Sequence, residues 1–451
     1  MNARSIGCLL LLMLFLGMSP SAVLGDGPTV GPQFQVNSYT TSYQYYPAVA
    51  GRGEGDFVVV WVSAGSNGTD SDERTVQAQR YASDGSPLGG EFQVNTYTTD
   101  GQYGPSVAVA TNGDFVVVWE SWGSVGPDTS ILSIQGQRFA ANGLPVEGQF
   151  QVNSYTTDQQ GGAAVAVDGD GNFVVVWESE GSPGSDSSNM SVQGQRFAFD
   201  GSPLGGQFQV NTYTTSLQNH AAVAVGADGS FVTVWRSHGS GGTDSSASSI
   251  QGRRFTSDGS PLGSDFQVNS FTDSSQGYPD VAVAADGGFM VVWESSQSGG
   301  TDSEGRSIQG RRFAADGTPL GSDFQVNSLT TDGQDEPRVG VDARGNFVVA
   351  WASDLPESPG SRSNSIQVQR YASDGSATGP QFQVNSYTTE NQYLAAVAVD
   401  PSGDFVVVWS SEGSAGTDSS GLSVQAQRFT LQLFADGFES GDTSGWSMTM
   451  P

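Results

Sequence analysis

Aspartates recur at one position of a serine- and glycine-rich segment that the chain uses several times. They are Asp70, Asp128, Asp186, Asp244, Asp302 and Asp418. Calcium takes several oxygen ligands, which Asp, Ser and Asn side chains can supply together with backbone carbonyls. The pattern therefore predicts calcium sites in these segments. The alternative is a turn in which each Asp bonds its own backbone.

Aromatic and histidine side chains are distributed unevenly over equivalent segments of the chain. The candidates for ligand binding are Tyr45, Tyr46, Tyr103, Trp122, His220, Tyr278 and Tyr393. Exposed aromatic rings with acidic and amide neighbours can bind sugar, because they offer apolar surface beside polar groups. We therefore predict that these residues bind a cell-surface glycan or a surface protein. Ordinary packing of loops is the alternative.

Residues suited to enzymatic catalysis are scarce. The chain has one cysteine, Cys8, and two histidines, His220 and His238. It contains no G-x-S-x-G, H-E-x-x-H or phosphate-loop motif. The sequence therefore predicts a protein that is not an enzyme. Because a pair of carboxylates is assembled in space and not along the sequence, a carbohydrate-active enzyme stays open as an alternative.

Three strings recur in a fixed order and show that most of the chain is one repeated unit. A string close to FVVVW begins at Phe57, and a string close to IQGQRF contains Arg80; both recur with constant spacing. Every interval is 58 residues. The third string, FQVN, begins at Phe34, Phe92, Phe150, Phe208, Phe266, Phe324 and Phe382.

Each unit contains four strand signals, as the second unit illustrates. Residues 106–110, 133–139 and 150–155 alternate along the chain, and residues 115–120 (FVVVWE) are typical of a strand buried on both faces. Turn-forming residues separate these segments. Four antiparallel strands per unit, repeated radially, predict an all-β fold: a seven-bladed β-propeller. An open β-solenoid is the second choice.

The order of the strand signals predicts how the ring closes. The array begins with a fourth-type strand at Phe34 and ends with a third-type strand at Phe429. The N-terminal strand can therefore complete the last blade, which leaves no end strand exposed. We expect the propeller to span residues 26–433.

Residues that are identical in all seven units should serve the ring. For the Trp that includes Trp61 we expect packing between blades. For the Arg that includes Arg80 we expect contacts with aromatic rings or backbone carbonyls. For the Gln that includes Gln44 we expect hydrogen bonds to the backbone. A specific binding site should instead break the sevenfold symmetry.

The two ends of the chain differ from the repeat. Residues 1–25 combine one charge, Arg4, with an apolar run at 8–18 and small residues up to Gly25. This layout predicts a signal peptide. Residues 434–451 form a C-terminal tail, which is either flexible or a sorting or processing segment. A mature chain without Cys8 would have no disulfide and no Cys-ligated metal.

The charge balance limits the partners. The chain has 17 Lys and Arg residues against 47 Asp and Glu residues, for a net charge of −30. Such a chain repels phosphate backbones and anionic membrane surfaces, so we expect no nucleic-acid partner. No later apolar stretch approaches transmembrane length, so we expect no membrane insertion. We expect a monomer.

The strings FQVNTYTT, FVVVWES and SIQGQRF, in this order, resemble repeats of large secreted or surface proteins of bacteria. Those repeats often neighbour RTX-type calcium-binding or cadherin-like modules. The resemblance covers about residues 28–433. It implies an extracellular propeller-like module, secreted or held on a bacterial surface, without an assigned activity. The family's second loop often reads D-G-S-G-x-G, whereas this chain has G-T-D-S-S.

These observations favour an exported adhesin or lectin-like binding module. The site should lie on the face of the propeller that carries the long loops, because function concentrates on loops held by a rigid frame. The alternative is a structural component of a surface or matrix, which a sevenfold symmetric loop face would favour. Converging carboxylates near His220 or His238 would favour a carbohydrate-active enzyme.

Overall fold

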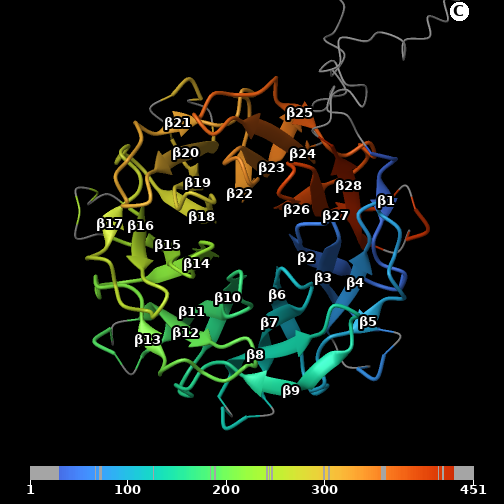
Figure 1. The fold of residues 1–451 in the computed structure, drawn as a ribbon. Coiled ribbons are helices and arrows are strands. Elements are labelled where there is room, and N and C mark those ends of the chain that lie inside the picture. Colours follow the sequence, from blue (N-terminus) through green and yellow to red (C-terminus); the bar gives the residue numbers. More distant parts are fainter. Residues whose placement is uncertain are drawn as a thin grey trace, which may run out of the picture.

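The computed structural model describes residues 30–430 apart from short gaps (Figure 1). The predicted signal peptide at 1–25 and the predicted tail at 434–451 lie outside the described residues. The gaps are residues 67, 71–73, 125, 129, 183, 187–188, 240–241, 243, 245–246, 298–299, 303–304, 357–361, 415 and 419–420.

Within the described residues the fold is all-β, with 28 strands in seven four-stranded antiparallel sheets. The sheets follow one another around a ring as the blades of a seven-bladed β-propeller (Figure 1), which confirms the predicted fold. No helix among these residues is long and apolar enough to cross a membrane.

Each blade has four strands, which we call inner, second, third and outermost, counted outward from the centre of the ring. We number the blades from 1 to 7 along the chain. The inner strands are β2 (Gln44–Gly51), β6 (Gln102–Val109), β10 (Gln160–Val167), β14 (Gln218–Val225), β18 (Gln276–Val283), β22 (Gln334–Val341) and β26 (Gln392–Val399). The second strands are β3 (Phe57–Ser63), β7 (Phe115–Trp122), β11 (Phe173–Glu180), β15 (Phe231–Ser237), β19 (Phe289–Ser295), β23 (Phe347–Pro356) and β27 (Phe405–Glu412).

The two outer layers of each blade follow the same order. The third strands are β4 (Thr75–Tyr81), β8 (Leu132–Phe139), β12 (Met190–Phe197), β16 (Ser249–Phe255), β20 (Ser307–Phe313), β24 (Arg362–Tyr371) and β28 (Leu422–Phe429). The outermost strands are β5 (Phe92–Gln93), β9 (Pro145–Gln151), β13 (Phe208–Gln209), β17 (Phe266–Gln267), β21 (Phe324–Gln325), β25 (Phe382–Gln383) and, for blade 7, β1 (Phe34–Gln35).

The N-terminal strand closes the ring. β1 pairs antiparallel with β28, with Phe34 opposite Ala426 and Gln35 opposite Gln425. The N–H of Val36 also donates a hydrogen bond to the carbonyl of Val424, at 2.8 Å. The predicted closure, in which the first strand completes the last blade, is therefore confirmed.

The second strands are buried on both sides because each lies between two neighbouring blades. The seven Trp side chains of these strands are at most 1% exposed. Trp119 of blade 2, for example, packs in one cluster with Val58 and Val60 of blade 1. Burial of a large aromatic side chain is a major source of stability, so these residues hold adjacent blades together. The packing role predicted for the Trp is confirmed.

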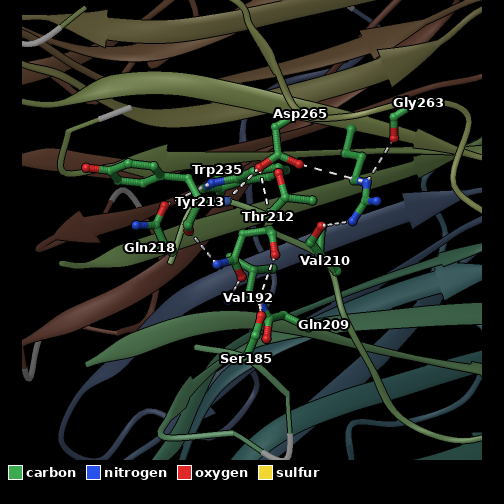
Figure 2. A network of polar contacts seen from close by, with 12 residues as sticks. Ser185, Val192, Gln209, Val210, Thr212, Tyr213, Gln218, Trp235, Gly263 and Asp265 are labelled. Carbon is green, nitrogen blue, oxygen red and sulfur yellow. Dashed lines mark hydrogen bonds and ion pairs between the residues drawn. The ribbon is translucent and has the colours of Figure 1, made fainter. Parts of the chain in front are cut away.

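Each buried indole is paired with the Gln that opens the inner strand. The Nε1 of Trp235 donates to Oε1 of Gln218 at 3.3 Å (Figure 2). The Nε2 of Gln218 donates in turn to the carbonyl of Thr215 at 3.1 Å. A buried N–H without an acceptor costs about 1–3 kcal/mol, which explains why the Gln accompanies the Trp in every blade.

In five of the seven blades the repeated Arg donates a hydrogen bond to a backbone carbonyl of the next blade. The Nη1 of Arg80 donates to the carbonyl of Ala141, and the Nη1 of Arg254 donates to the carbonyl of Ala315, both at 2.6 Å. Arg428 of blade 7 donates to the carbonyl of Ser83 in blade 1. Backbone carbonyls are thus among the partners, as predicted for the Arg.

The connections alternate between two faces of the ring. One face carries the loops from the second to the third strands and the linkers to the next inner strands, and we call it the long-loop face. The other carries the remaining turns and is called the short-turn face. Blade 6 differs at the long-loop face because β23 and β24 are extended to ten residues each.

Candidate functional site

A β-bulge interrupts every inner strand close to its start on the long-loop face. In β14 the register shifts between Asn219 and Ala222, and the other six inner strands shift at the equivalent position. The bulge places one residue per blade at a φ between 49° and 61°. We call these seven residues the inner rim: Tyr46, Gly104, Gly162, His220, Tyr278, Glu336 and Leu394.

Five inner-rim residues are not glycine. Left-handed backbone costs a residue with a Cβ roughly 1–2 kcal/mol, and such strain concentrates at functional sites. Bulges also redirect side chains beside active and binding sites. The inner rim is therefore a place where a nearly symmetric ring holds different side chains in a strained conformation.

Six of the seven predicted ligand-binding residues lie at this level of the ring. Tyr46, His220 and Tyr278 are inner-rim residues, and each of the other three directly precedes one: Tyr45, Tyr103 and Tyr393. The seventh, Trp122, ends β7 one strand further out and is 45% exposed.

The inner strands of blades 1, 2 and 7 supply four of the tyrosines: Tyr45, Tyr46, Tyr103 and Tyr393. The Nε of Arg74 donates to Oη of Tyr45 at 2.6 Å, and its Nη1 donates to Oη of Tyr103 at 3.1 Å. The rings of Tyr45 and Tyr46 lie 5.2 Å apart at an angle of 51°. Tyr46 remains 48% exposed. This side of the inner rim thus offers a fixed group of rings with one accessible face.

Electrostatic effects connect the tyrosines with more distant blades. Burial raises the pKa of Tyr46, and the negative charges of Glu336 in blade 6 and Glu120 in blade 2 raise it further. Burial, then the charge of Glu412 and the hydroxyls of nearby tyrosines, raise the pKa of Tyr393 to about 12. The acidity of these tyrosines therefore depends on side chains of several blades.

A stacked pair of rings connects blades 4 and 5. The rings of His220 and Tyr278 lie 4.3 Å apart at 24°, although they belong to adjacent blades. Burial lowers the pKa of His220 to about 4, and the positive charges of Arg236 and Arg338 contribute. The imidazole is therefore neutral at pH 7, and can donate or accept a hydrogen bond.

Glutamates that the sequence analysis missed connect successive blades beside the inner rim. An Oε1 of Glu120 accepts the N–H of Gly162 at 2.7 Å, and an Oε1 of Glu178 accepts the N–H of His220 at 2.5 Å. Glu294 accepts the N–H of Glu336 in the same way. Each Glu directly follows the repeated Trp. The sequence could have indicated these positions, because the residue after the Trp varies among the units whereas the Trp does not.

Two of these carboxyl groups have strongly altered acidity. Burial raises the pKa of Glu178 to about 7. The hydrogen bond from the N–H of His220 lowers this pKa, and the charge of Glu120 raises it by a smaller amount. Burial also raises the pKa of Glu294 to about 7, and the nearby Asp335 adds to the rise. Groups that exchange protons near pH 7 are a feature of catalytic and binding sites.

Arginines occur beside the same side chains. Arg306 donates from Nη2 to Oδ2 of Asp335 at 2.6 Å, and its Nε lies 3.4 Å from Oε1 of Glu294. Arg236 occupies, in blade 4, the position that Glu120, Glu178 and Glu294 occupy in theirs. The inner rim and the side chains beside it therefore combine aromatic rings, carboxyl groups, an imidazole and guanidinium groups, which suits a polar ligand with apolar faces.

The aspartates predicted to bind calcium have another role in the structure. Their side chains are buried, and each Oδ2 accepts a hydrogen bond from the Asn of an FQVN string, as Asp128 does from Asn153 at 2.7 Å. The same Asn accepts the N–H of Ile134 at 2.8 Å. The other five pairs are Asp70–Asn95, Asp186–Asn211, Asp244–Asn269, Asp302–Asn327 and Asp418–Asn37.

These aspartates hold the long loops in place and are dispersed, one in each blade except blade 6. Within the described residues, no group of three or more His, Cys, Asp or Glu side chains is close enough to hold a metal ion. Calcium binding by these residues stays a prediction. A nearby network serves the frame as well, since Asp265 accepts the N–H groups of Thr212 and Tyr213 (Figure 2).

Comparison with known proteins supports the fold. No family model matches the chain, and no curated protein matches it. Among solved structures, it resembles an ulvan lyase of polysaccharide lyase family PL25 bound to -[GlcA(1-4)Rha3S]-, with a TM-score of 0.54 and 10% identity, covering 87% of this chain and 95% of the other.

A second similar structure is a protein of unknown function from Dyadobacter fermentans DSM 18053. Its TM-score is 0.51 at 9% identity, and the match covers 89% of this chain and 99% of the other. At these identities the similarity shows a shared propeller fold. Any activity has to be argued from the residues of the inner rim.

Proposed function

We propose that this protein binds a polysaccharide at the inner rim on its long-loop face. The observation that carries the proposal is the convergence of Tyr45, Tyr46, Tyr103, His220, Tyr278 and Tyr393 at equivalent positions of five blades. These are positions at which the blades differ, whereas the frame around them repeats. A specific ligand needs such a break in symmetry.

The chemistry of the inner rim fits sugars. Aromatic rings such as the half-exposed Tyr46 can pack against the apolar face of a sugar ring. Carboxyl groups such as Glu178 and Glu336 can accept hydrogen bonds from hydroxyl groups, and arginines can donate them. A site with a few fixed polar groups among aromatic side chains is the usual composition of a ligand site.

We further propose that the protein acts outside the cell, as an exported adhesin or lectin-like module on a bacterial surface. The layout of residues 1–25 supports export. The purely structural alternative is less well supported, because the inner rim is not sevenfold symmetric. The acidic exterior, with a net charge of −30, would keep such a protein soluble under either function.

A carbohydrate-active enzyme is the second candidate function. The specific observation in its favour is Glu178, whose carboxyl pKa is raised to about 7 and whose Oε1 accepts the backbone N–H of His220. A carboxyl group of this acidity can transfer protons at neutral pH. Incubation with polysaccharides and measurement of released reducing ends, in the wild type and in Glu178→Gln, would test this function. Release that is lost in Glu178→Gln would establish it.

The experiment that tests binding is a glycan array probed with purified residues 26–451, in calcium and again in EDTA. The proposal predicts binding to specific glycans in both conditions, because the inner rim needs no metal for its hydrogen bonds. Binding only in calcium would show that the loop aspartates or another metal site take part. Absence of binding in both conditions would contradict the proposal.

A further inference from the structure

Blade 4 breaks a rule that its neighbours follow. In blades 2, 3 and 5 the residue after the repeated Trp is Glu120, Glu178 or Glu294, and each carboxylate accepts an inner-rim N–H of the next blade. In blade 4 this residue is Arg236. A guanidinium group has no acceptor, so it cannot make the same contact.

The buried Nε of Arg236 has no hydrogen-bond acceptor among the described residues. The ion pairs found among those residues involve other arginines. By contrast, Arg306 pairs with Asp335 and approaches Glu294. A buried donor without an acceptor is unfavourable, and more so when it is charged.

Two further buried atoms beside Arg236 lack hydrogen-bond partners among the described residues. They are Oδ1 of Asn219 and Nδ1 of His220. Asn219 lies opposite Arg236 in the β14–β15 pair, and His220 is the next residue. Buried polar atoms are nearly always satisfied, so three unsatisfied atoms on adjacent residues call for a ligand or water at that place.

The neighbouring blade packs against this group. A Cβ built on Gly277 of blade 5 would lie 3.8 Å from Cδ of Arg236, which is ordinary van der Waals contact. The next residue is Tyr278, whose ring stacks on His220 and so forms one side of the same place. Asn219, His220, Arg236 and Tyr278 together are called the Arg236 subsite.

We propose that the Arg236 subsite binds an anionic substituent, a carboxylate or a sulfate, on the polysaccharide. This inference rests on the proposed function and specifies its substrate class. An anion would supply the acceptor that the Nε of Arg236 lacks, in a charge-assisted hydrogen bond. His220 can donate a hydrogen bond to the anion when its proton is on Nδ1, and Oδ1 of Asn219 can accept one from a hydroxyl group of the sugar. Tyr278 can pack against the sugar that carries the substituent.

The charge of the protein narrows the class of polysaccharide. With a net charge of −30, the chain would repel a densely charged polyanion. At physiological ionic strength this repulsion is screened beyond about 8 Å, so one local guanidinium can still attract one anionic group. The Arg236 subsite therefore fits a chain that is largely neutral and carries acidic substituents at intervals.

The test uses pairs of oligosaccharides that differ only in charge. One pair is an oligogalacturonate with spaced free carboxylates and its fully methyl-esterified form. The other is a sparsely sulfated galactan oligomer and its desulfated form. For at least one pair, the wild type should bind the acidic member about tenfold or more tightly, as expected for a charge-assisted contact. The pair that shows the preference distinguishes carboxylate from sulfate.

The decisive variant is Arg236→Glu, which gives blade 4 the residue found in blades 2, 3 and 5. The ring already accommodates Glu at this position, so the variant should fold, and urea unfolding would verify that it does. It should lose the preference for the acidic member. Arg344→Glu makes the same charge change on the short-turn face and should keep the preference.

Two results would overturn the inference while leaving the proposed function intact. One is equal binding of the acidic and neutral members of both pairs by the wild type. The other is a preference that persists in Arg236→Glu. Binding of no oligosaccharide, either here or on the glycan array, would contradict the proposed function and with it the inference.

Discussion

His220 and Tyr278 stack with their ring centroids 4.3 Å apart, across the boundary between blades 4 and 5. They occupy the same position in consecutive units, one repeat of 58 residues apart. Because the ring places equivalent positions of neighbouring blades side by side, a difference between units becomes a contact in space. This relationship explains how a repeated sequence can build a single asymmetric site.

The pH dependence of stability should report the burial of Glu178. Its pKa is about 7 in the folded protein, against an ordinary value of 4.5 for the unfolded chain. The folded state therefore holds more protons between pH 4.5 and pH 7. The contribution of this group to stability is fully present below pH 4.5 and is lost as the pH rises toward 7.

Replacing the ionisable group should remove this dependence. We expect Glu178→Gln to gain stability relative to the wild type between pH 4.5 and pH 7.5, by about 1–3 kcal/mol. The measurement is urea unfolding of both proteins at several pH values. Comparing the two proteins cancels the opposite effect of His220, whose lowered pKa makes stability rise with pH. A constant difference across the range would show that Glu178 titrates normally.

The pairing of loop aspartates with FQVN asparagines should contribute to stability. We expect Asp128→Ala and Asn153→Ala each to lower the free energy of unfolding by about 1–3 kcal/mol, because each leaves a buried polar partner unsatisfied. The double variant should cost less than the sum of the two, since they share one hydrogen bond. If urea unfolding shows that the loss of stability in the double variant equals the sum of the two single losses, the coupling is refuted.

The same proteins can decide the calcium prediction. If Asp128 serves only the loop, calcium and EDTA should leave the unfolding midpoint of the wild type unchanged. A ligand that binds the folded state stabilises it in proportion to its occupancy. A midpoint that rises with calcium concentration, and no longer does so in Asp128→Ala, would establish a metal site there.

Ring closure can be tested by a disulfide between Gln35 and Gln425, which lie opposite each other in β1 and β28. The equivalent pair within one blade is Gln251 and Gln267. In residues 26–451, which lack other cysteines, Gln35→Cys/Gln425→Cys would close the whole ring, whereas Gln251→Cys/Gln267→Cys would close a short loop.

The two disulfides should differ in effect. Chain entropy predicts about 3 kcal/mol of stabilisation for a loop of about 15 residues and about 5 kcal/mol or more for loops beyond about 100. Oxidation should therefore raise the free energy of unfolding of the ring-closing variant more than it raises that of the control variant. Failure of Gln35→Cys/Gln425→Cys to form a disulfide would contradict the pairing of β1 with β28.

The constant 58-residue period made the fold predictable from sequence. Because every unit has the same four strand signals, the blade, the number of blades and the closing strand could be inferred from the phase of the strings. Invariant residues such as Trp61 and Gln44 were correctly assigned to the frame. Repetition amplifies a local pattern, which makes such an inference more secure than it is for a chain without repeats.

The site was predictable only in part. Tyr46, His220 and Tyr278 stood out because aromatic side chains vary among the linkers. Glu178 and Arg236 were not predicted, because both lie within second strands, whose pattern indicates only buried frame residues. Their alignment after the repeated Trp was visible, but the bulge that brings this position beside the inner rim is a property of the folded sheet.

The role of the loop aspartates depended on a contact between distant segments. Asp128 and Asn153 are 25 residues apart. Along the chain, Asp128 precedes the third strand of its blade and Asn153 follows the outermost strand. Nothing in the local sequence of the loop shows that its carboxylate accepts a bond from the end of the outermost strand. Oxygen-rich loops therefore predict a cation or a hydrogen-bonded turn equally well.

The central claim is that the inner rim binds a polysaccharide, and it is tested most directly by affinity. The tightest ligand from the glycan array should be titrated calorimetrically into the wild type, Tyr278→Ala and Phe199→Ala. Phe199 is 69% exposed in a turn of the short-turn face, so it serves as a matched aromatic control.

We predict that Tyr278→Ala weakens binding by about tenfold or more, since a stacked aromatic residue is a typical centre of binding energy. Phe199→Ala should bind as the wild type does. Unchanged affinity in Tyr278→Ala, together with weakened affinity in Phe199→Ala, would place the ligand on the short-turn face and contradict the account.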